Sequence, residues 1–261
     1  MSDSNLVAYE IRETAAVITL HRPDRRNALS RGLIEAISAA FTRAADDAAA
    51  RAVILTAAGS VFCAGMDLAE LQASLDIPPE QTPIWDDAFR LARLYDQVYA
   101  LPKPTIAAIQ GAAVAGGAGL VTVCDLAVAV PDAKLGYPEV RRGLVAAMVM
   151  PHLLRHVGER MARYLLLSGE TISADEACRA GLINEVVAPE RLLPRALELA
   201  RACAEGGPHA LAKTKEYLRQ FSHQAMPIED AAKASAAPRL TEERQQSLRA
   251  FFAKQPAPWV K

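Results

Sequence analysis

The chain contains 261 residues, of which 51% are hydrophobic and 5% are aromatic, so we expect leucine, valine and alanine to fill a large core. Its net charge of -1 gives no field that attracts nucleic acid or a membrane surface, so a few local Lys or Arg side chains must hold any anionic ligand. The sequence shows no signal-peptide pattern and no long apolar span, so we expect a cytoplasmic protein. Its four cysteines include no CxxC pair, so we expect reduced thiols and no metal site.

Strand-like and helix-like segments alternate through the first half of the chain. Short apolar runs predict strands, while apolar residues three and four apart predict helices, one of them capped by Ser30. The predicted strands are residues 17–20, 52–56, 105–109 and 125–130, and the predicted helices are residues 30–45 and 83–101. Strands separated by helices in this way predict a parallel sheet with crossover helices.

Strand signals end at about Val187. From residue 189 to residue 254 the pattern is helical, with breaks at Gly206-Gly207-Pro208, Pro227 and Pro238. We therefore divide the chain into an α/β core, residues 1–188, and a helical C-terminal region, residues 189–261. The apolar side chains of that region exceed what one core face covers, which predicts an oligomer; the clearest examples are Leu197, Leu211, Leu218, Phe251 and Phe252.

Two loops of small residues, 60–68 and 110–119, each follow a strand and lead into a helix. Glycines such as Gly65 let the backbone approach a ligand, and amides at the start of a helix point outward unpaired. Two such loops can aim two amide donors at one oxygen, which is the arrangement of an oxyanion hole. The alternative is close packing of strands and helices without chemistry. Neither loop has the spacing of a nucleotide-binding fingerprint.

Seven short segments of the chain are informative together because of their order and spacing. They are His21–Leu29, Phe62–Leu68 (FCAGMDL), Pro102–Ile109 (PKPTIAAI), Gln110–Gly117 (QGAAVAGG), Cys124–Leu126, Leu135–Glu139 (LGYPE) and Gly181–Val187. From about residue 17 to residue 254 they resemble the motifs of the crotonase (enoyl-CoA hydratase/isomerase) superfamily. The resemblance implies an α/β fold of the ClpP/crotonase type, a spiral of ββα units with a helical C-terminal region that mediates trimerisation.

The resemblance also implies an enzyme that acts on acyl-CoA thioesters as a trimer or a dimer of trimers. It implies no separate cofactor, because coenzyme A enters as part of the substrate, and no nucleic-acid or membrane partner. The matching positions assign the oxyanion hole to the amides of Met66 and Gly116 and the catalytic base to Glu139. They assign contacts with coenzyme A to Ala64, Asp67, Leu68, Phe251 and Lys254.

Some of these residues have simpler interpretations. The Asp67 side chain is also placed to cap the following helix. Phe251 and Lys254 also fit an amphipathic terminal helix with a solvated lysine. A protein that binds CoA thioesters but has lost catalysis is a rival from another functional class.

The chain departs from the family pattern at Gly119, where hydratases carry a second glutamate. One remaining carboxylate suffices to move a proton between two carbons, so we expect double-bond isomerisation to be favoured, with hydration as the alternative. Gly119→Glu is expected to raise hydration more than isomerisation, provided that the glycine is not needed for a tight helix contact. A second departure, Val145–Met148 in place of the usual PGxGG, is expected to reshape the acyl pocket.

Overall fold

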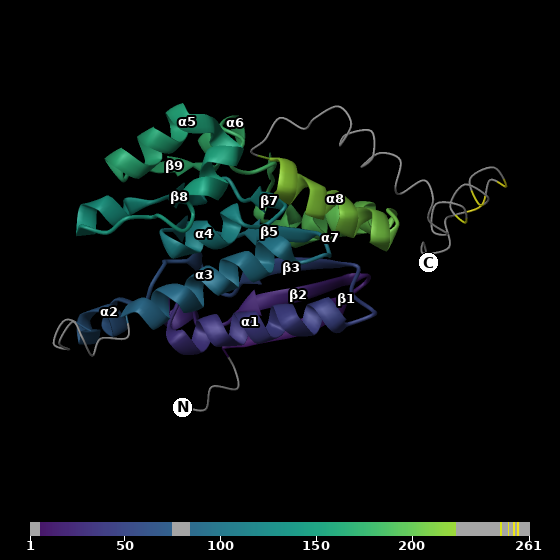
Figure 1. Ribbon diagram of the computed structural model, residues 1–261, viewed down its shortest axis with the longest axis horizontal. Helices are drawn as coiled ribbons and strands as arrows, with labels where there is room; N and C mark the ends of the chain where they lie inside the picture. Colours follow the sequence, from purple (N-terminus) through teal and green to yellow (C-terminus); the bar gives the residue numbers. More distant parts are fainter. Residues whose placement is uncertain are drawn as a thin grey trace.

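A computed structural model describes residues 6–74 and 84–222, together with Gln246, Ala250, Ala253 and Gln255. Figure 1 shows a stack of strands with α1 and α3 in front of it, and a second group of short strands beside α5 and α6. These strands form two sheets, one of six strands and one of four. Both sheets matter for the site, because one carries the core and the other carries the loops.

The larger sheet contains β1 (Val7–Arg12), β2 (Ala15–Leu20), β3 (Ala52–Ala57), β5 (Thr105–Ile109), β7 (Leu126–Ala129) and β10 (Glu185–Val186), in that spatial order. The first two strands are antiparallel, and every later pair is parallel. Strands β2, β3 and β5 are buried along almost their whole length, as expected for parallel strands covered on both faces. The predicted parallel sheet is confirmed.

The smaller sheet contains β4 (Val61–Cys63), β6 (Ala112–Val114), β8 (Lys134–Gly136) and β9 (Thr171–Ser173). Each of its first three strands directly follows a strand of the larger sheet along the chain. After β4, β6 and β8 the chain forms helices: α2 (Leu68–Ser74) and α3 (Ile84–Ala100), α4 (Gly116–Thr122), and α5 (Met150–Ser168). The chain therefore repeats a strand–strand–helix unit, and successive units stack in parallel.

The helices begin and pack for local reasons that the sequence already indicates. Helix α1 (Arg31–Asp46) is capped by the Ser30 hydroxyl, which accepts a hydrogen bond of 3.2 Å from the Leu33 amide. On α3 the buried side chains are spaced by three and four residues, as on an amphipathic helix; they are Leu91, Leu94, Tyr95 and Val98. Helix α6 (Ala174–Arg179) starts with a capping box between Ser173 and Glu176.

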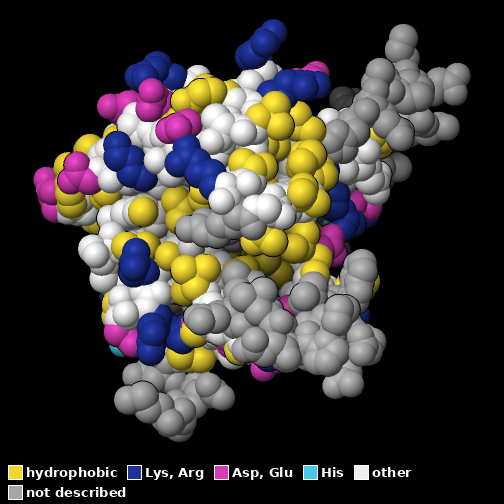
Figure 2. Space-filling view, turned by 90° about the vertical axis from the view of Figure 1, so that its left-hand side faces the viewer, with side chains coloured by type: hydrophobic (Ala, Val, Ile, Leu, Met, Phe, Trp, Pro, Cys, Tyr) yellow, Lys and Arg dark blue, Asp and Glu magenta, His cyan; other side chains and the backbone are white. Residues whose placement is uncertain are grey.

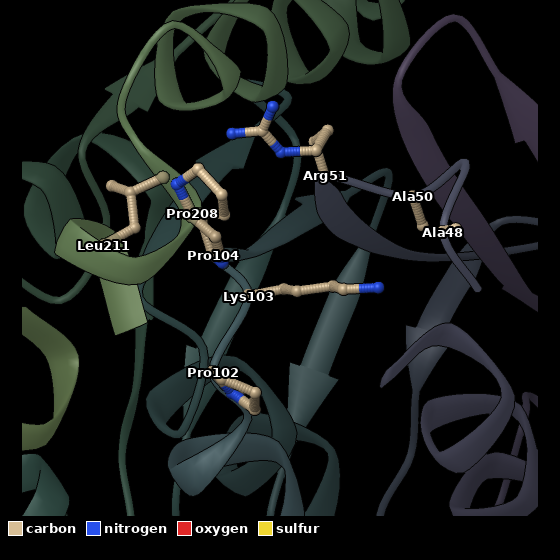
Figure 3. Close-up of a pocket in the computed structure, with 8 residues that line it drawn as sticks. All are labelled: Ala48, Ala50, Arg51, Pro102, Lys103, Pro104, Pro208 and Leu211. Atoms are coloured by element: carbon tan, nitrogen blue, oxygen red, sulfur yellow. The ribbon is translucent and has the colours of Figure 1, made fainter. Parts of the chain in front are cut away.

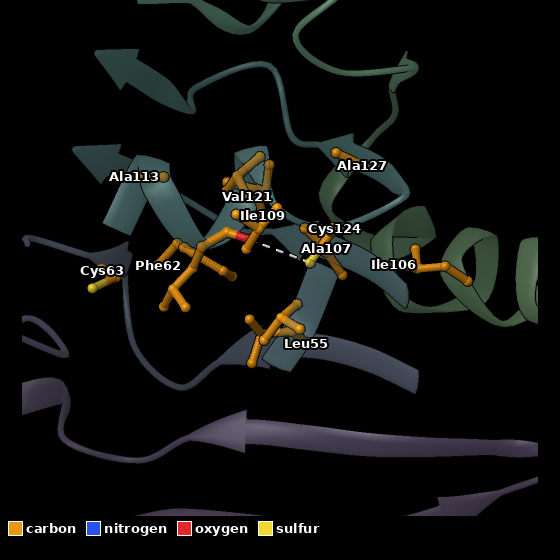
Figure 4. Close-up of a cluster of buried hydrophobic side chains, with 14 of the residues drawn as sticks. Leu55, Phe62, Cys63, Ile106, Ala107, Ile109, Ala113, Val121, Cys124 and Ala127 are labelled. Atoms are coloured by element: carbon orange, nitrogen blue, oxygen red, sulfur yellow. Dashed lines mark hydrogen bonds between the residues drawn. The ribbon is translucent and has the colours of Figure 1, made fainter. Parts of the chain in front are cut away.

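One part of the core joins elements of the two sheets. Figure 4 shows side chains from β3, β4, β5 and α4 meeting there, among them Leu55, Phe62, Ile109 and Val121. Two cysteines share this region. Burial raises the pKa of both the Cys63 and the Cys124 thiol to about 12, so both stay protonated. Cys63 is therefore a small core residue and not an activated nucleophile.

The helical region after residue 189 begins with a 3₁₀ turn (Pro189–Arg191), followed by α7 (Leu192–Ala204) and α8 (Pro208–Phe221). The predicted break at Gly206-Gly207-Pro208 separates these two helices. Helix α7 packs on β3, β5 and β7 through Ala196 and Ala200, so the first part of this region shares the core. The boundary at residue 188 stays a prediction, because most of residues 223–261 lie outside the described part of the chain.

Candidate active site

The site lies where β4, β6 and β8 end side by side. Their pairing aligns Cys63 with Ala113 and Ala113 with Leu135. Loops that leave three aligned parallel strands emerge at the same edge of the sheet. Met66, Gly116 and Glu139 follow these strands within a few residues, so register alone brings together three positions that are far apart in the sequence.

Small residues let the first two loops touch backbone to backbone. Gly65 has a φ of 85°, and a Cβ there would come within 2.8 Å of the Ala115 Cβ and 3.2 Å of the Gly116 nitrogen. A Cβ on Gly117 would come within 2.3 Å of the Cys63 carbonyl oxygen. Close packing therefore does not exclude an oxyanion hole, because the same contact places the Gly116 nitrogen beside Gly65.

The backbone amide of Met66 is turned away from Leu29 by the hydrogen bonds of its neighbours. Leu29 donates to the Gly65 carbonyl at 2.8 Å, and its own carbonyl accepts from the Asp67 amide at 3.1 Å. Peptide groups alternate in direction along an extended segment, so the Met66 amide between them faces away from Leu29. Met66 itself lines the pocket.

Gly116 supplies the second amide. It is the first residue of α4, a position where the amide has no partner inside the helix. Ala115 before it has a φ of 50°, which turns the chain sharply into the helix. Gly116 lines the same pocket as Met66. Two backbone donors at one pocket form the kind of arrangement that stabilises negative charge on a carbonyl oxygen.

The pocket has a volume of about 340 Å³, which is within the range of small-molecule sites. Figure 2 views the molecule from the side of α2, where hydrophobic side chains gather around the middle of the face. One wall is formed by residues 144–149, which include the Val145–Met148 segment expected to shape the acyl pocket. Val145 is 71% exposed and lies at the opening, whereas Val149 at the end of this wall is buried in the core.

Among the described residues, three carboxylates line the pocket, and Arg31 engages two of them. Its guanidinium donates to both oxygens of Asp87 at 2.6 and 2.7 Å, and its backbone amide donates to Glu70 at 3.1 Å. The third is Glu139, on the 3₁₀ helix Pro138–Arg142 that follows β8, with its Oε2 atom buried. Its position at the end of β8 places it beside the loop that carries Gly116.

The sequence did not point to Tyr95, which also lines the pocket. Its hydroxyl is buried and donates a hydrogen bond of 2.8 Å to the Gly116 carbonyl. Burial, the neighbouring Cys63 and Tyr137, and the charge of Glu139 together hold the pKa of Tyr95 well above its usual value. One signal was available: among the α3 residues whose burial is described, Tyr95 is the buried one with a polar side-chain group.

The structure corrects the expectation for Gly119→Glu. A Cβ on Gly119 would come within 2.3 Å of the Tyr95 hydroxyl oxygen and 2.7 Å of the Val149 Cγ1. A gain in hydration was expected only if the glycine is not needed for a tight helix contact. That condition fails, because the glycine is needed for contact between α4 and α3. A glutamate at this position is expected to disrupt packing before it can assist hydration.

The residues expected to contact coenzyme A are placed differently from one another. Ala64 and Leu68 line the pocket. The Asp67 carboxylate instead pairs with Arg22 at 2.5 Å and accepts from the Ala69 amide at 2.9 Å. Burial alone would raise the pKa of Asp67, but these two bonds lower it below its usual value, as expected for a helix-start cap. Phe251 and Lys254 lie outside the described residues, so their roles stay predictions.

A second pocket, of about 290 Å³, lies between the start of β3 and the start of α8 (Figure 3). Its Lys103 amine donates to the carbonyls of Ala44 and Asp47 at 2.7 and 2.8 Å. Arg51 donates to the Gly206 carbonyl at 2.8 Å. Both cations are thus engaged by backbone carbonyls, and we assign this pocket no chemistry.

The described part of the chain holds no cluster of three or more His, Cys, Asp or Glu side chains arranged for a metal ion. None of its helices is both long enough and apolar enough to cross a membrane.

Comparisons with known proteins identify the family of the chain. A family model for enoyl-CoA hydratase/isomerase matches residues 10–261. A Thermus thermophilus protein provisionally named an enoyl-CoA hydratase is 42% identical over 245 residues, covering 92% of this chain and 95% of its own. The crotonyl-CoA hydratase of Syntrophomonas wolfei is 34% identical and covers 100% and 99%. A Legionella pneumophila structure, provisionally described as an enoyl-CoA hydratase/isomerase (crotonase), has a TM-score of 0.90 at 31% identity and covers 98% and 99%.

Proposed function

Because the chain belongs to the enoyl-CoA hydratase/isomerase family, and is therefore an enzyme that acts on CoA thioesters, we propose that its preferred reaction is double-bond isomerisation. The substrate would be a 3-enoyl-CoA and the product a 2-enoyl-CoA. The crotonase-like fold expected from the sequence is confirmed by the structural comparison. The finer choice of reaction rests on the polar groups of the pocket.

The reaction needs one base and one site for negative charge. With the thioester oxygen between the amides of Met66 and Gly116, Glu139 removes a proton from carbon 2 of the 3-enoyl group. The electron pair of that C–H bond delocalises over the C3=C4 double bond and the thioester carbonyl, so the oxygen becomes an enolate oxygen held by the two amides. Glu139 then returns the proton to carbon 4, and the double bond is left between carbons 2 and 3.

One observation carries this choice. Glu139 lines the pocket and follows the strand beside the Gly116 loop. Gly119 offers no side chain, so a second carboxylate is not available at that position. A single carboxylate suffices to shuttle a proton along an allylic system.

Hydration of a 2-enoyl-CoA is the second candidate, and the name of a relative favours it. The Syntrophomonas wolfei protein is named a crotonyl-CoA hydratase and aligns with the whole of this chain. Hydration uses the same oxyanion hole and the same enolate, but it also needs a group that holds water. The two reactions therefore differ in one requirement of the site.

We also propose that the enzyme works in the cytoplasm as a homo-oligomer, a trimer or a dimer of trimers. Exposed apolar side chains support the assembly: Leu218 on α8 is 62% exposed and Leu167 on α5 is 71% exposed. Leu197 and Leu211, named from the sequence with Leu218, are half-buried. Leu218 is therefore the clearest of the three as a surface residue for a partner copy.

The test compares kcat/KM for a 3-enoyl-CoA and the matching 2-enoyl-CoA, alongside exchange of the carbon 2 protons of butanoyl-CoA with D2O. Isomerisation should be faster than hydration, and the exchange should depend on Glu139. Faster hydration would reverse the preference. Binding of acyl-CoA without exchange or turnover would favour a non-catalytic binding protein.

A further inference from the structure

We propose that the Tyr95 hydroxyl holds a water molecule beside Glu139 and so gives the enzyme a second, slower activity, the hydration of 2-enoyl-CoA. The inference rests on the proposed function, because it uses the same oxyanion hole and the same base. Tyr95 lies outside the sequence motifs. The proposal gives Tyr95 the task of holding water, which hydration requires and isomerisation does not.

The first step of the argument is the position of the phenol. Tyr95 is 3% exposed, yet it lines the pocket together with Gly116 and Glu139. Its oxygen lies where a side chain on Gly119 would begin, 2.3 Å from the Cβ that position would carry. A polar atom thus occupies the place on α4 from which a second acid would have to reach the substrate.

The second step is the direction of its hydrogen bonds. The hydroxyl proton is donated to the Gly116 carbonyl at 2.8 Å, so the oxygen can act toward the pocket only through its lone pairs. A water molecule that donates one proton to this oxygen and the other to the Glu139 carboxylate has its own lone pair directed at the substrate. Tyr95 does not titrate in this role, since its pKa is held well above its usual value.

The third step is the balance of the reaction. The water oxygen bonds to carbon 3, and the electrons of the C2=C3 bond pass into the thioester, whose oxygen is held by the amides of Met66 and Gly116. One water proton passes to Glu139, and the other stays on the new hydroxyl, which remains hydrogen-bonded to Tyr95. Glu139 then gives its proton to carbon 2, so one water has been added and every group of the enzyme is restored.

A neutral phenol is a weaker acceptor than a carboxylate, because hydrogen bonds to charged groups are about twice as strong. Hydration is therefore expected to be slower than isomerisation in the same enzyme. This agrees with the preference proposed above.

Tyr95→Phe removes the oxygen and keeps the ring. We expect kcat/KM for hydration of 2-butenoyl-CoA to fall about tenfold further than the rate of C2 proton exchange in butanoyl-CoA, which needs the oxyanion hole and Glu139 but no added water. The ratio of the two rates in one sample does not depend on the fraction of folded protein. Tyr99→Phe is the matched control, because Tyr99 lies one turn further along α3 and packs against His152. It should leave the ratio unchanged.

An equal loss of both rates would mean that Tyr95 acts only by supporting Gly116, and the water role would be wrong. An unchanged hydration rate, or a wild-type enzyme that exchanges C2 protons but does not hydrate, would also overturn it. A wild-type enzyme that shows no C2 exchange would instead refute the proposed function. The two failures are therefore distinguishable.

Discussion

Contact between the first two loops of the site can be tested by replacing Gly117 with alanine. The new Cβ would lie 2.3 Å from the Cys63 carbonyl oxygen and 2.8 Å from its carbonyl carbon. Both atoms belong to the backbone, so no side-chain rotation relieves the contact. Because Cβ contacts under 3.0 Å essentially do not occur, the loops must separate by about 0.7 Å.

This separation acts on the oxyanion hole directly, because Gly117 follows Gly116 and Cys63 shortly precedes Met66. A misplacement of about 1 Å can cost about 10²-fold in rate, so we expect kcat/KM to fall by between about tenfold and a hundredfold. Overpacking costs about 1–3 kcal/mol, and the better helix propensity of alanine in α4 offsets up to about 1 kcal/mol of it. The melting temperature should fall by a few degrees.

The assay is turnover of a 3-enoyl-CoA, with thermal unfolding followed by circular dichroism on the same preparation. Gly206→Ala is the control, since its nearest neighbours are at 3.2 Å and it lies between α7 and α8. The control should keep its activity. Wild-type kcat/KM and an unchanged melting temperature in Gly117→Ala would refute the idea that backbone contact between the loops sets the positions of the two amides.

Four further predictions follow from the site and the surface. Glu139→Gln should reduce turnover by about 10²–10⁴-fold, while folding and acyl-CoA binding, measured by calorimetry, persist. The control Glu159→Gln, on the exposed face of α5, should retain activity. An active Glu139→Gln enzyme would show that Glu139 is not the base. Gly119→Glu should lower the melting temperature without raising hydration, and a gain in hydration would show that α3 can move aside. Light scattering should give a mass well above 28.0 kDa at micromolar concentration, and a monomer would contradict the oligomer. Cys63 and Cys124 should resist alkylation at pH 9 until the protein is unfolded, because burial raises the pKa of both thiols to about 12. The unfolded chain loses these protons first, so the stability of the fold should fall as pH rises from about 9 toward about 12. Rapid labelling of the native protein would show that these thiols are accessible.

Much of the framework could be predicted from the sequence because it depends on short-range patterns. Strand β5 occupies the predicted residues 105–109, and α1 starts after Ser30 because a hydroxyl there can satisfy a helix amide. Strands β4, β6, β8 and β9 were not predicted, since three residues are too few to show a period of two. These short strands nevertheless form the sheet that carries the candidate site.

The sequence by itself therefore determined the buried strands, the capped helices and the family, through local periodicity and the order of its motifs. Tertiary structure decided which groups meet. Register across β4, β6 and β8 aligned the segments that carry Met66, Gly116 and Glu139, and the packing of α3 on α4 put the Tyr95 hydroxyl where Gly119 has no side chain. The physical reason is that a contact between two helices depends on how they cross in space, and no local pattern in either helix records that crossing.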